Sequence, residues 1–413
     1  MSKKLSFFGI VTMLVTFLSF SANAQQTTPK LVPEMKTLKI GVVSPQSGPI
    51  AFYGMSMLRG VSLSVKNINE KGTLGKGPGI LVGNQRYKLE IVSYDDMGDP
   101  AKSVIGMRKL VEMYKVPVLL GPVGTPHTWA CEEINVQLGV LFNGMSTSDL
   151  SRKKGNPLYI QEHVPGQYYG DPMAQACIEK GYKKACVLAD ISEAYRSWGK
   201  RFKEKFESLG GQVLGFESVD TKTTTDFHSI MTSFKARNPD IIFICSYEEP
   251  LALATKHALE VGYKGKFLFN SEFAAKAEKI VELEKLEGSL MHMWPSWYCV
   301  KYPSEDKRGY VTTFLKQYRE TYKEDFGTIA FSIQPVAYMF ARAMEIAGTV
   351  TDVYAIRAAC PKALQEDKLP IVYHYTDVLK NGLFYGSRDL MAEINSGRHK
   401  VIRELLVQRE LLE

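Results

Sequence analysis

The chain contains few cysteines, and they lie far apart. Six occur among 413 residues, and no two form a C-x-x-C pair, which excludes a zinc ribbon and a thioredoxin-type redox motif. Cys186 and Cys245 lie in apolar, strand-like runs, where a buried free thiol is the simplest interpretation. The other four are Cys131, Cys177, Cys299 and Cys360. No disulfide pairing follows from the sequence, and no structural metal is expected.

Motifs of common hydrolases and metalloproteases are also absent. There is no G-x-S-x-G and no H-E-x-x-H, and the seven histidines have no close metal spacing. His127 beside Thr128, followed by Glu132 and Glu133, resembles a base with an orienting group. A histidine in a first helical turn more simply donates a hydrogen bond to a ligand. We therefore predict no catalytic activity, no metal and no cofactor.

Long apolar runs and basic clusters are missing beyond the N-terminal region. The formal net charge is +7, but basic and acidic residues are interspersed, so nucleic acid is not an expected partner. No run is long enough to span a bilayer, so no membrane insertion of the mature chain is expected. The length suffices for two or three domains of ordinary size.

The first 24 residues have the organisation of a secretory signal peptide. Lys3 and Lys4 precede the mostly apolar run Leu5–Phe20, and Ala22-Asn23-Ala24 fits an A-x-A cleavage site. The run is shorter than the roughly 20 residues that a membrane anchor needs, and Ser and Thr interrupt it. No cysteine follows that would carry a lipid. We predict cleavage after Ala24 and a soluble periplasmic protein.

Short β-branched runs alternate with amphipathic helical stretches from Leu38 onward, in two successive series. Such alternation is typical of parallel sheets covered by helices, so two α/β lobes are expected. The first series predicts strands at 38–43, 87–94, 116–120 and 140–142 and helices at 53–70, 100–114 and 126–138. The second predicts strands at 184–188, 212–218, 240–245 and 266–269 and helices at 166–180, 198–209, 226–237 and 249–261. A strand-like stretch at 158–163 joins the series, helices recur at 309–324 and 332–347, and no clear periodicity follows residue 369.

Several short segments resemble the Leu/Ile/Val-binding protein family of ABC importers. They are Ile40–Gly48, Ala51–Gly54, Tyr94–Ala101, Leu119–Pro122, His163–Pro165, and Asp190 with Tyr195. The resemblance implies a type I periplasmic-binding-protein fold: α/β, with two doubly wound parallel-sheet lobes joined by three crossovers, near 158–163, 286–293 and 368–380. Lobe 1 would comprise 37–160 and 291–370, and lobe 2 would comprise 161–290 and 371–413.

The turn Gly121–Thr128 is the main candidate site. Pro126 suits a first helical position, so Thr125 is the expected N-cap and the amides of His127 and Thr128 are expected to be free. Free amides at a helix start attract anions, although ordinary capping without a ligand is the simpler alternative. The resemblance implies that this turn holds a ligand carboxylate and that Thr125 supplies a hydroxyl.

The next turn, Asn143–Ser148, resembles the family segment that completes the grip on the carboxylate. Ser146 takes the hydroxyl position. Both turns follow strand ends, where open α/β sheets bind ligands. Gly144 and Met145 stand where small residues are usual, and Met145 is expected to intrude on the pocket.

From the opposite lobe, Tyr195 resembles the tyrosine that closes over the ligand; simple packing is the alternative. Amino-acid binders of the family carry a glutamate for the ligand ammonium, but Pro250 takes that position here, after Glu248 and Glu249. An α-amino acid ligand therefore requires one of these glutamates to reach the site.

Aromatic rings provide further candidates. Trp294, Trp297 and Tyr298 cluster past the second crossover and are expected to line a pocket, although core packing is the commoner role of such rings. Tyr53 and Phe52, at the entry to the first helix, are weaker candidates.

The expected function is capture of a small carboxylate-containing molecule between two closing lobes, for delivery to an ABC-importer permease and its ATPase subunits. The alternative is a ligand-binding sensor that acts through a separate membrane receptor. A monomer is expected. The sequence does not choose among amino acids, aromatic or aliphatic acids, and amides.

Overall fold

The two predicted α/β series form two separate sheets. The computed structural model describes residues 35–149, 154–221, 223–270, 275–324, 328–372, 375, 377–386 and 389–412, so the predicted signal peptide lies outside the described residues. The first sheet has six strands in the order β2-β3-β1-β4-β5-β6, and the second has seven in the order β15-β14-β11-β10-β9-β7-β8.

The first sheet is parallel except for β2, which pairs antiparallel with β3. Its centre is apolar because β1 and β4 are buried on both faces, as expected of a parallel sheet between helices. The strands are β1 (Lys36–Ser44), β2 (Ile80–Val82), β3 (Gln85–Asp95), β4 (Val118–Val123), β5 (Leu141–Met145) and β6 (Tyr159–Ile160).

Two groups of helices cover this sheet. Helix α1 buries Met57, Val61 and Ile68 at helical spacing, and these join a core with residues of α12, α13 and α14. A second core on the other face includes Met107 of α2 and Cys131 of α3. The helices are α1 (Ala51–Lys71), α2 (Pro100–Tyr114), α3 (Thr125–Glu132), α4 (Asn135–Leu138), α12 (Tyr310–Tyr322), α13 (Thr328–Ala347) and α14 (Val353–Leu364).

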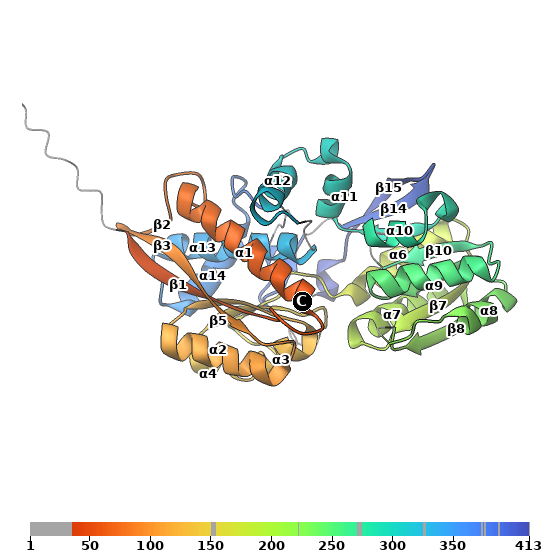
Figure 1. Cartoon of the computed structure of the whole chain (residues 1–413), viewed down its shortest axis with the longest axis horizontal. Helices are drawn as coiled ribbons and strands as arrows, with labels where there is room; N and C mark the ends of the chain where they lie inside the picture. Colours follow the sequence, from red (N-terminus) through yellow and green to blue (C-terminus); the bar gives the residue numbers. More distant parts are fainter. Residues whose placement is uncertain are drawn as a thin grey trace, which may run out of the picture. The chain divides into compact units, whose positions relative to one another are not determined.

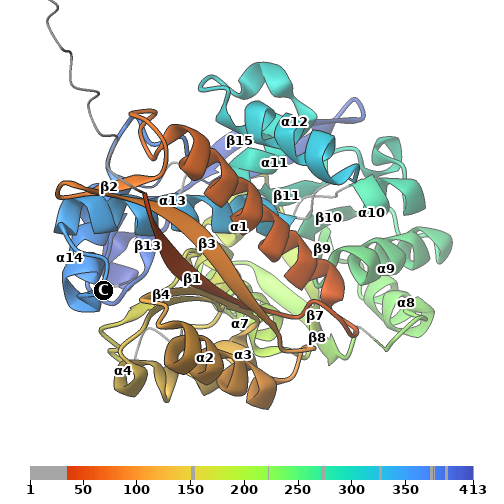
Figure 2. The same cartoon turned by 60° about the vertical axis from the view of Figure 1, so that its left-hand side comes forward.

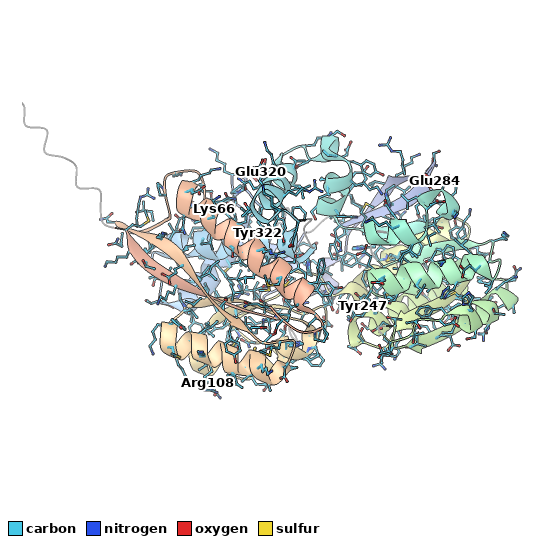
Figure 3. All side chains as sticks on the ribbon, viewed as in Figure 1. Lys66, Arg108, Tyr247, Glu284, Glu320 and Tyr322 are labelled. Atoms are coloured by element: carbon cyan, nitrogen blue, oxygen red, sulfur yellow. The ribbon has the colours of Figure 1, made fainter. Side chains whose placement is uncertain are left out.

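The figures show this layering within the first lobe. Helix α1 lies along one face of the β1–β3 sheet, and α2 and α3 lie on the opposite face (Figures 1 and 2). Tyr322, at the end of α12, donates its hydroxyl to the carbonyl of Arg59 in α1 at 3.1 Å (Figure 3). This bond fixes a helix from late in the sequence against the first one.

The second sheet is parallel from β11 to β8 and ends in the antiparallel strands β14 and β15. Phe202 of α7 and Met173 of α6 belong to the core on one face, and Phe234 of α8 and Leu251 of α9 belong to the core on the other. The strands are β7 (Lys184–Asp190), β8 (Gln212–Val219), β9 (Ile241–Cys245), β10 (Lys266–Phe269), β11 (Leu290–Met293), β14 (Asp389–Asn395) and β15 (Arg398–Leu405). The helices are α6 (Gly170–Glu179), α7 (Glu193–Ser208), α8 (His228–Ala236) and α9 (Glu248–Glu260).

Shorter elements complete the described chain. They are η1 (Gly166–Tyr169), α10 (Ala275–Ile280), η2 (Leu283–Leu286), α11 (Pro295–Lys301), η3 (Pro303–Glu305), β12 (Asp377–Val378), β13 (Phe384–Tyr385) and η4 (Arg409–Leu411). Strands β12 and β13 pair with each other, and an isolated bridge joins Gln161 to Leu383. The stretches around the predicted first and third crossovers are therefore hydrogen-bonded to each other.

Three expectations for the elements were wrong. The predicted helix 126–138 is split into α3 and α4. At the break the amide of Ile134 donates to the carbonyl of Cys131, three residues back, and buried Asn135 donates its side-chain amide to the carbonyls of Val140 and Leu158. The predicted helix 198–209 begins earlier, at Glu193, so Tyr195 lies in its first turn. The aperiodic end of the chain contains the β14–β15 hairpin, whose turn residues Ser396 and Gly397 both have positive φ.

Candidate functional site

The hydroxyls of Thr125 and Ser146 meet at the carboxyl ends of β4 and β5. Their oxygens lie 3.2 Å apart, and either can be the donor. The backbone connects the same two turns, because the amide of Gly124 donates to the carbonyl of Met145 at 3.1 Å. Ser146 is buried, and its Oγ also accepts from the amide of Ser148 at 3.1 Å. The structure thus brings together the two hydroxyls that the sequence singled out.

The start of α3 differs from the prediction. Gly124, with φ of 105°, is the N-cap, and Thr125 is the first helical residue without a capping hydrogen bond. The amide of Thr128 is not free, because it donates to the carbonyl of Gly124 at 3.0 Å, and the Thr128 hydroxyl donates to the same oxygen. Among the described residues, no acceptor is recorded for the amides of Thr125 and His127. The amides without an acceptor at this helix start are therefore those of Thr125 and His127, and not the predicted pair of His127 and Thr128.

His127 folds back over the same turn. A Cβ on residue 124 would lie 3.0 Å from Nδ1 of His127, so glycine provides both the positive φ and the space. The imidazole is 8% exposed, and within the described part of the chain neither ring nitrogen has a hydrogen-bond partner. Buried polar groups normally have partners, so this ring is available to a polar ligand atom.

Gly144 and Met145 have packing roles. A Cβ on Gly144 would lie 2.3 Å from Cγ2 of Thr128, so β5 can approach α3 only with glycine here. The side chain of Met145 belongs to the first-lobe core, together with Leu141 two pleats earlier on the same face of β5. The expected intrusion of Met145 on a ligand pocket stays a prediction.

Carboxylates fix the loops beside these turns. Asp95 accepts from the amides of Gln46 at 2.8 Å and Met97 at 2.9 Å, and from the Ser47 hydroxyl at 2.6 Å. Burial acts to raise the pKa of Asp95, but these hydrogen bonds outweigh it and hold the pKa below its usual value. Asp99 caps α2 through the amides of Ala101 and Lys102. The edge of the sheet is thereby held in one arrangement.

Tyr195 forms part of an aromatic group. Its ring packs edge to face against that of Tyr247, with centroids 4.8 Å apart. Burial is the main cause that raises the pKa of Tyr195 well above its usual value, with Tyr247 and Tyr53 as further causes. The pKa of Tyr53 is also raised, by burial and then by Tyr247 and Glu248. The phenols of Tyr195 and Tyr53 therefore favour their neutral forms, and both lie within electrostatic range of Tyr247.

Tyr247 was not predicted as a site residue. It is the N-cap of α9, directly beyond β9 and Ser246 (Figure 3). The sequence could have indicated it, because Tyr247 follows a predicted strand of the second lobe, as Tyr195 does. Phe52, by contrast, is 56% exposed and packs edge to face on Tyr53.

The two glutamates differ in surroundings. Oε1 of Glu248 accepts from the amide of Ala277 at 3.4 Å, near the start of α10, and the side chain is half-buried. Glu249 is exposed. Glu248 also acts electrostatically on Tyr53, which places it nearer than Glu249 to the aromatic group.

A buried polar network underlies the second-lobe strand ends. Asp190 accepts from the hydroxyl of Thr221 at 2.5 Å and from its amide at 3.0 Å. The Thr221 hydroxyl lies 2.7 Å from that of Ser246, whose amide donates to Asn270 at 2.9 Å. The network joins the ends of β7, β8, β9 and β10, so Tyr195 and Tyr247 extend from a rigid edge.

The predicted tryptophan cluster is divided. Trp294 packs on the rings of His163 at 4.9 Å and His292 at 4.7 Å. Tyr298 instead packs on Tyr302 at 4.9 Å, and Trp297 contacts the cores of both lobes. Trp294 alone of these three rings packs on His163, which belongs to the predicted first crossover.

Glu162, beside His163, is a buried acid. Its Oε2 accepts from the side-chain amide of Asn143 at 2.5 Å. Burial raises its pKa to about 7, against the opposing effect of that hydrogen bond. Burial lowers the pKa of His163 to about 4. The stretch that joins β6 to η1 thus carries two ionisable groups that favour their neutral forms.

Two doubly wound lobes with polar strand ends define the type I periplasmic-binding-protein fold. Solved structures share it: a branched-chain amino acid binding protein from Streptococcus pneumoniae in complex with isoleucine has a TM-score of 0.69 at 20% identity, covering 89% of this chain and 100% of that one. A solute-binding protein from R. palustris in complex with benzoate has a TM-score of 0.70 at 18% identity, covering 90% and 97%.

A family model described as periplasmic binding protein matches residues 37–374. The chain belongs to this family. The Leu/Ile/Val-binding protein of Citrobacter freundii is 23% identical over 258 residues, which are 62% of this chain and 67% of that protein. The match thus spans about two thirds of that relative's length. Among the described residues, no helix combines the length and apolar character that crossing a membrane requires.

Proposed function

We propose that this chain is an extracytoplasmic solute-binding protein that captures a small carboxylate with an apolar body and delivers it to an ABC importer. The observation that carries the proposal is the 3.2 Å approach of the Thr125 and Ser146 hydroxyls at the start of α3. Donors at a helix start favour an anion over a neutral group because of the helix dipole.

Three kinds of donor support a carboxylate at this position. The hydroxyls of Thr125 and Ser146 can each turn toward a ligand oxygen, and the amide of Thr125 has no recorded acceptor within the described chain. The buried ring of His127 offers a further N–H. Hydrogen bonds to a charged acceptor contribute roughly 1.5–3 kcal/mol each, so two or three of them account for a specific anchor.

The second lobe supports an apolar body more than an ammonium group. Tyr195 and Tyr247 of this lobe, together with Tyr53 of α1 in the first lobe, are aromatic rings with a hydroxyl at one end, and such rings provide area at little entropic cost. Glu249 is exposed, and Glu248 is held toward α10. Similar structures hold isoleucine in one case and benzoate in another, and these ligands share only the carboxylate and an apolar group.

Export and partners follow from the same function. The signal peptide at 1–24 would direct the chain to the periplasm, and a permease with its ATPase subunits would receive the ligand. Closure of lobe 1 (37–160, 291–370) onto lobe 2 (161–290, 371–413) would bring Tyr195 and Tyr247 onto a ligand anchored at Thr125 and Ser146.

A thermal-shift panel tests the proposal. Protein stripped of ligand by unfolding and refolding is heated with benzoate, 4-hydroxybenzoate, leucine and isoleucine, each paired with the amide that replaces its carboxylate. A ligand that binds only the folded state raises Tm by mass action. We expect at least one acid to raise Tm while its amide does not. Stabilisation only by molecules without a carboxylate would contradict the proposal.

A further inference from the structure

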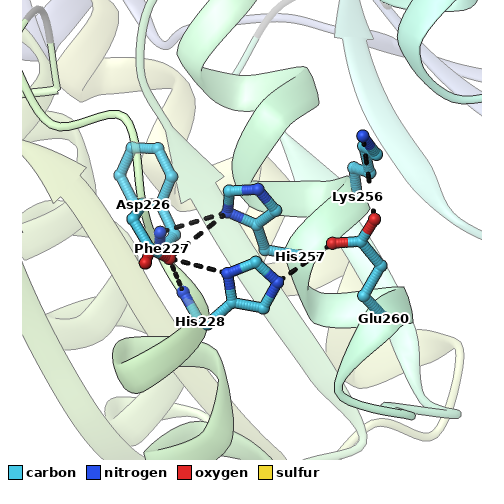
Figure 4. Close-up of polar contacts among 6 residues, drawn as sticks. All are labelled: Asp226, Phe227, His228, Lys256, His257 and Glu260. Atoms are coloured by element: carbon cyan, nitrogen blue, oxygen red, sulfur yellow. Dashed lines mark hydrogen bonds and ion pairs between the residues drawn. The ribbon is translucent and has the colours of Figure 1, made fainter.

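The second lobe carries a cluster of metal-ligating side chains at the outer ends of α8 and α9. Donor atoms of Asp226, His228 and His257 all lie within 4.8 Å of one another (Figure 4). Asp226 and His228 flank the start of α8, and His257 lies in the last turn of α9. His257 lies ten residues after Tyr247, about 15 Å along α9 at 1.5 Å per residue.

The spacing of the donors suits one small ion. Asp226 Oδ1 lies 2.6 Å from Nδ1 of His228 and 4.0 Å from Nδ1 of His257. Ligands bound at about 2.1 Å in tetrahedral geometry are about 3.4 Å apart. The distance from Asp226 to His228 is shorter than this value, and the distance from Asp226 to His257 is longer. The Asp226 side chain is 75% exposed and that of His228 44% exposed, so rotation of these side chains is sufficient to adjust both distances.

Glu260 fixes the tautomer that such a site needs. Its Oε2 lies 3.0 Å from Nε2 of His228, and Lys256 lies 3.7 Å from its other oxygen. Without an ion, Nδ1–H of His228 donates to Asp226 and Nε2–H donates to Glu260. A bound ion would take the place of the Nδ1 proton, while Nε2–H stays donated to Glu260. A carboxylate behind a ligating histidine is the usual arrangement in metal sites, and it orients the ring.

The second histidine is also pre-positioned. The rings of His228 and His257 are stacked with centroids 3.9 Å apart and an angle of 24°. Nδ1 of His257 accepts from the amide of Phe227 at 3.1 Å, so its lone pair already points toward the cluster. Binding an ion there replaces one backbone hydrogen bond, whose net contribution is about 1 kcal/mol.

Charge and ligand type select the ion. The carboxylates of Asp226 and Glu260, and the C-terminal end of the α9 dipole, favour a cation, whereas Lys256 and the start of α8 oppose it. Imidazole nitrogens with one carboxylate suit zinc, copper or nickel, while magnesium and calcium prefer oxygen ligands throughout.

We propose that Asp226, His228 and His257 bind one divalent transition-metal ion, with Zn²⁺ as the reference ion, and that Glu260 positions His228. The ion joins the start of α8 to the end of α9 on the surface of the second lobe. Neither helix supplies the site alone, because Asp226 and His228 are separated in sequence from His257 by most of two helices and the strand β9.

Calorimetric titration of the tag-free mature protein tests this. After treatment with EDTA and its removal, ZnSO₄ is expected to bind with a stoichiometry of one, and MgCl₂ is not. His228→Gln, His257→Gln and Asp226→Asn should each weaken Zn²⁺ binding at least about 10-fold, and Glu260→Gln about 10–100-fold. Glu204→Gln, at an exposed carboxylate of α7, is the matched control and should leave binding unchanged.

Circular dichroism in EDTA establishes that each variant is folded. His257 is 7% exposed, so if its substitution disturbs the fold, the exposed positions 226 and 228 decide the question. Zinc binding that survives both His228→Gln and Asp226→Asn overturns the proposal, as does the absence of zinc binding by the unmodified protein.

Discussion

Nε2 of His292 lies 2.9 Å from Oδ2 of Asp389, and both side chains are completely buried. The pair crosses from β11 to β14, the two strands at which the second sheet changes from parallel to antiparallel. The rings of Tyr169 and Trp294 pack on the imidazole at 4.8 and 4.7 Å. A polar pair thus lies inside an aromatic enclosure where water has no access.

Removing one partner of this pair should be strongly destabilising. Asp389→Ala leaves a buried imidazole without its acceptor, and His292→Ala leaves a buried carboxylate, so each should lower the free energy of unfolding by about 3–5 kcal/mol. The double variant His292→Ala, Asp389→Ala should lose less than the sum of the two, because neither member of the pair is left without the other. Urea denaturation measures all three, and additive losses would contradict a coupled pair.

Gly144→Ala should distort the first-lobe site through Thr128. The added methyl would lie 2.3 Å from Cγ2 of Thr128, and overpacking of this kind costs about 1–3 kcal/mol. Thr128→Ser removes that methyl and keeps the hydroxyl that donates to Gly124. The double variant should therefore recover part of the lost Tm. No recovery would place the strain elsewhere, for example at Phe142, 3.0 Å from the same methyl.

Thr125→Ala combined with Ser146→Ala should weaken binding of the acid that stabilises the protein most. We expect a loss of about 1.5–3 kcal/mol for each hydroxyl that bonds a carboxylate. Calorimetry gives the change in Kd. Thr313→Ala with Thr321→Ala, at exposed hydroxyls of α12, is the control. An unchanged Kd in the site variant would remove both hydroxyls from the anchor.

Glu162→Gln should change the dependence of stability on pH. Because burial raises the folded-state pKa of Glu162 to about 7, above about 4.3 in the unfolded chain, its stabilising contribution is complete below pH 4.3 and is lost as pH rises through 7. Glutamine stays neutral. The variant should match the parent near pH 4.5 and exceed it by up to about 4 kcal/mol at pH 8, since each pH unit is worth about 1.4 kcal/mol.

Comparing the two proteins at each pH cancels the opposite effect of His163, whose lowered pKa removes stability as pH falls from 6.5 toward 4. A difference between parent and variant that is constant from pH 4.5 to 8 would show that Glu162 does not titrate in this range.

The sequence predicts helices and strands best where local chemistry marks their ends. Helix α2 begins at Pro100 because Asp99 caps it, and both signals are local. The break between α3 and α4 was missed, because no proline or glycine marks it in the sequence, and the bond from Asn135 to the distant carbonyl of Leu158 beside it forms only in the fold. The β14–β15 hairpin did have a local signal, the Ser396-Gly397 turn, but its partner β11 is far away in sequence.

The same distinction applies to the sites. Thr125 and Ser146 were predicted as neighbours because each follows a strand of one parallel sheet, and strand ends meet at one edge. The burial of Met145 depends on which face of β5 it occupies. The cluster of Asp226, His228 and His257 has no sequence signature, since only the packing of α8 on α9 creates it.

The order of the second sheet has a consequence for biogenesis. Strand β11 pairs with β14, but the two strands are far apart in sequence. Helices α12, α13 and α14, which belong to the other lobe, are synthesised between them. Pairing across such a separation is slow, because a long loop must close before the contacts form. One edge of β11 therefore stays unpaired until β14 has been made, so the second lobe can complete its sheet only after the helices of the first lobe have been synthesised.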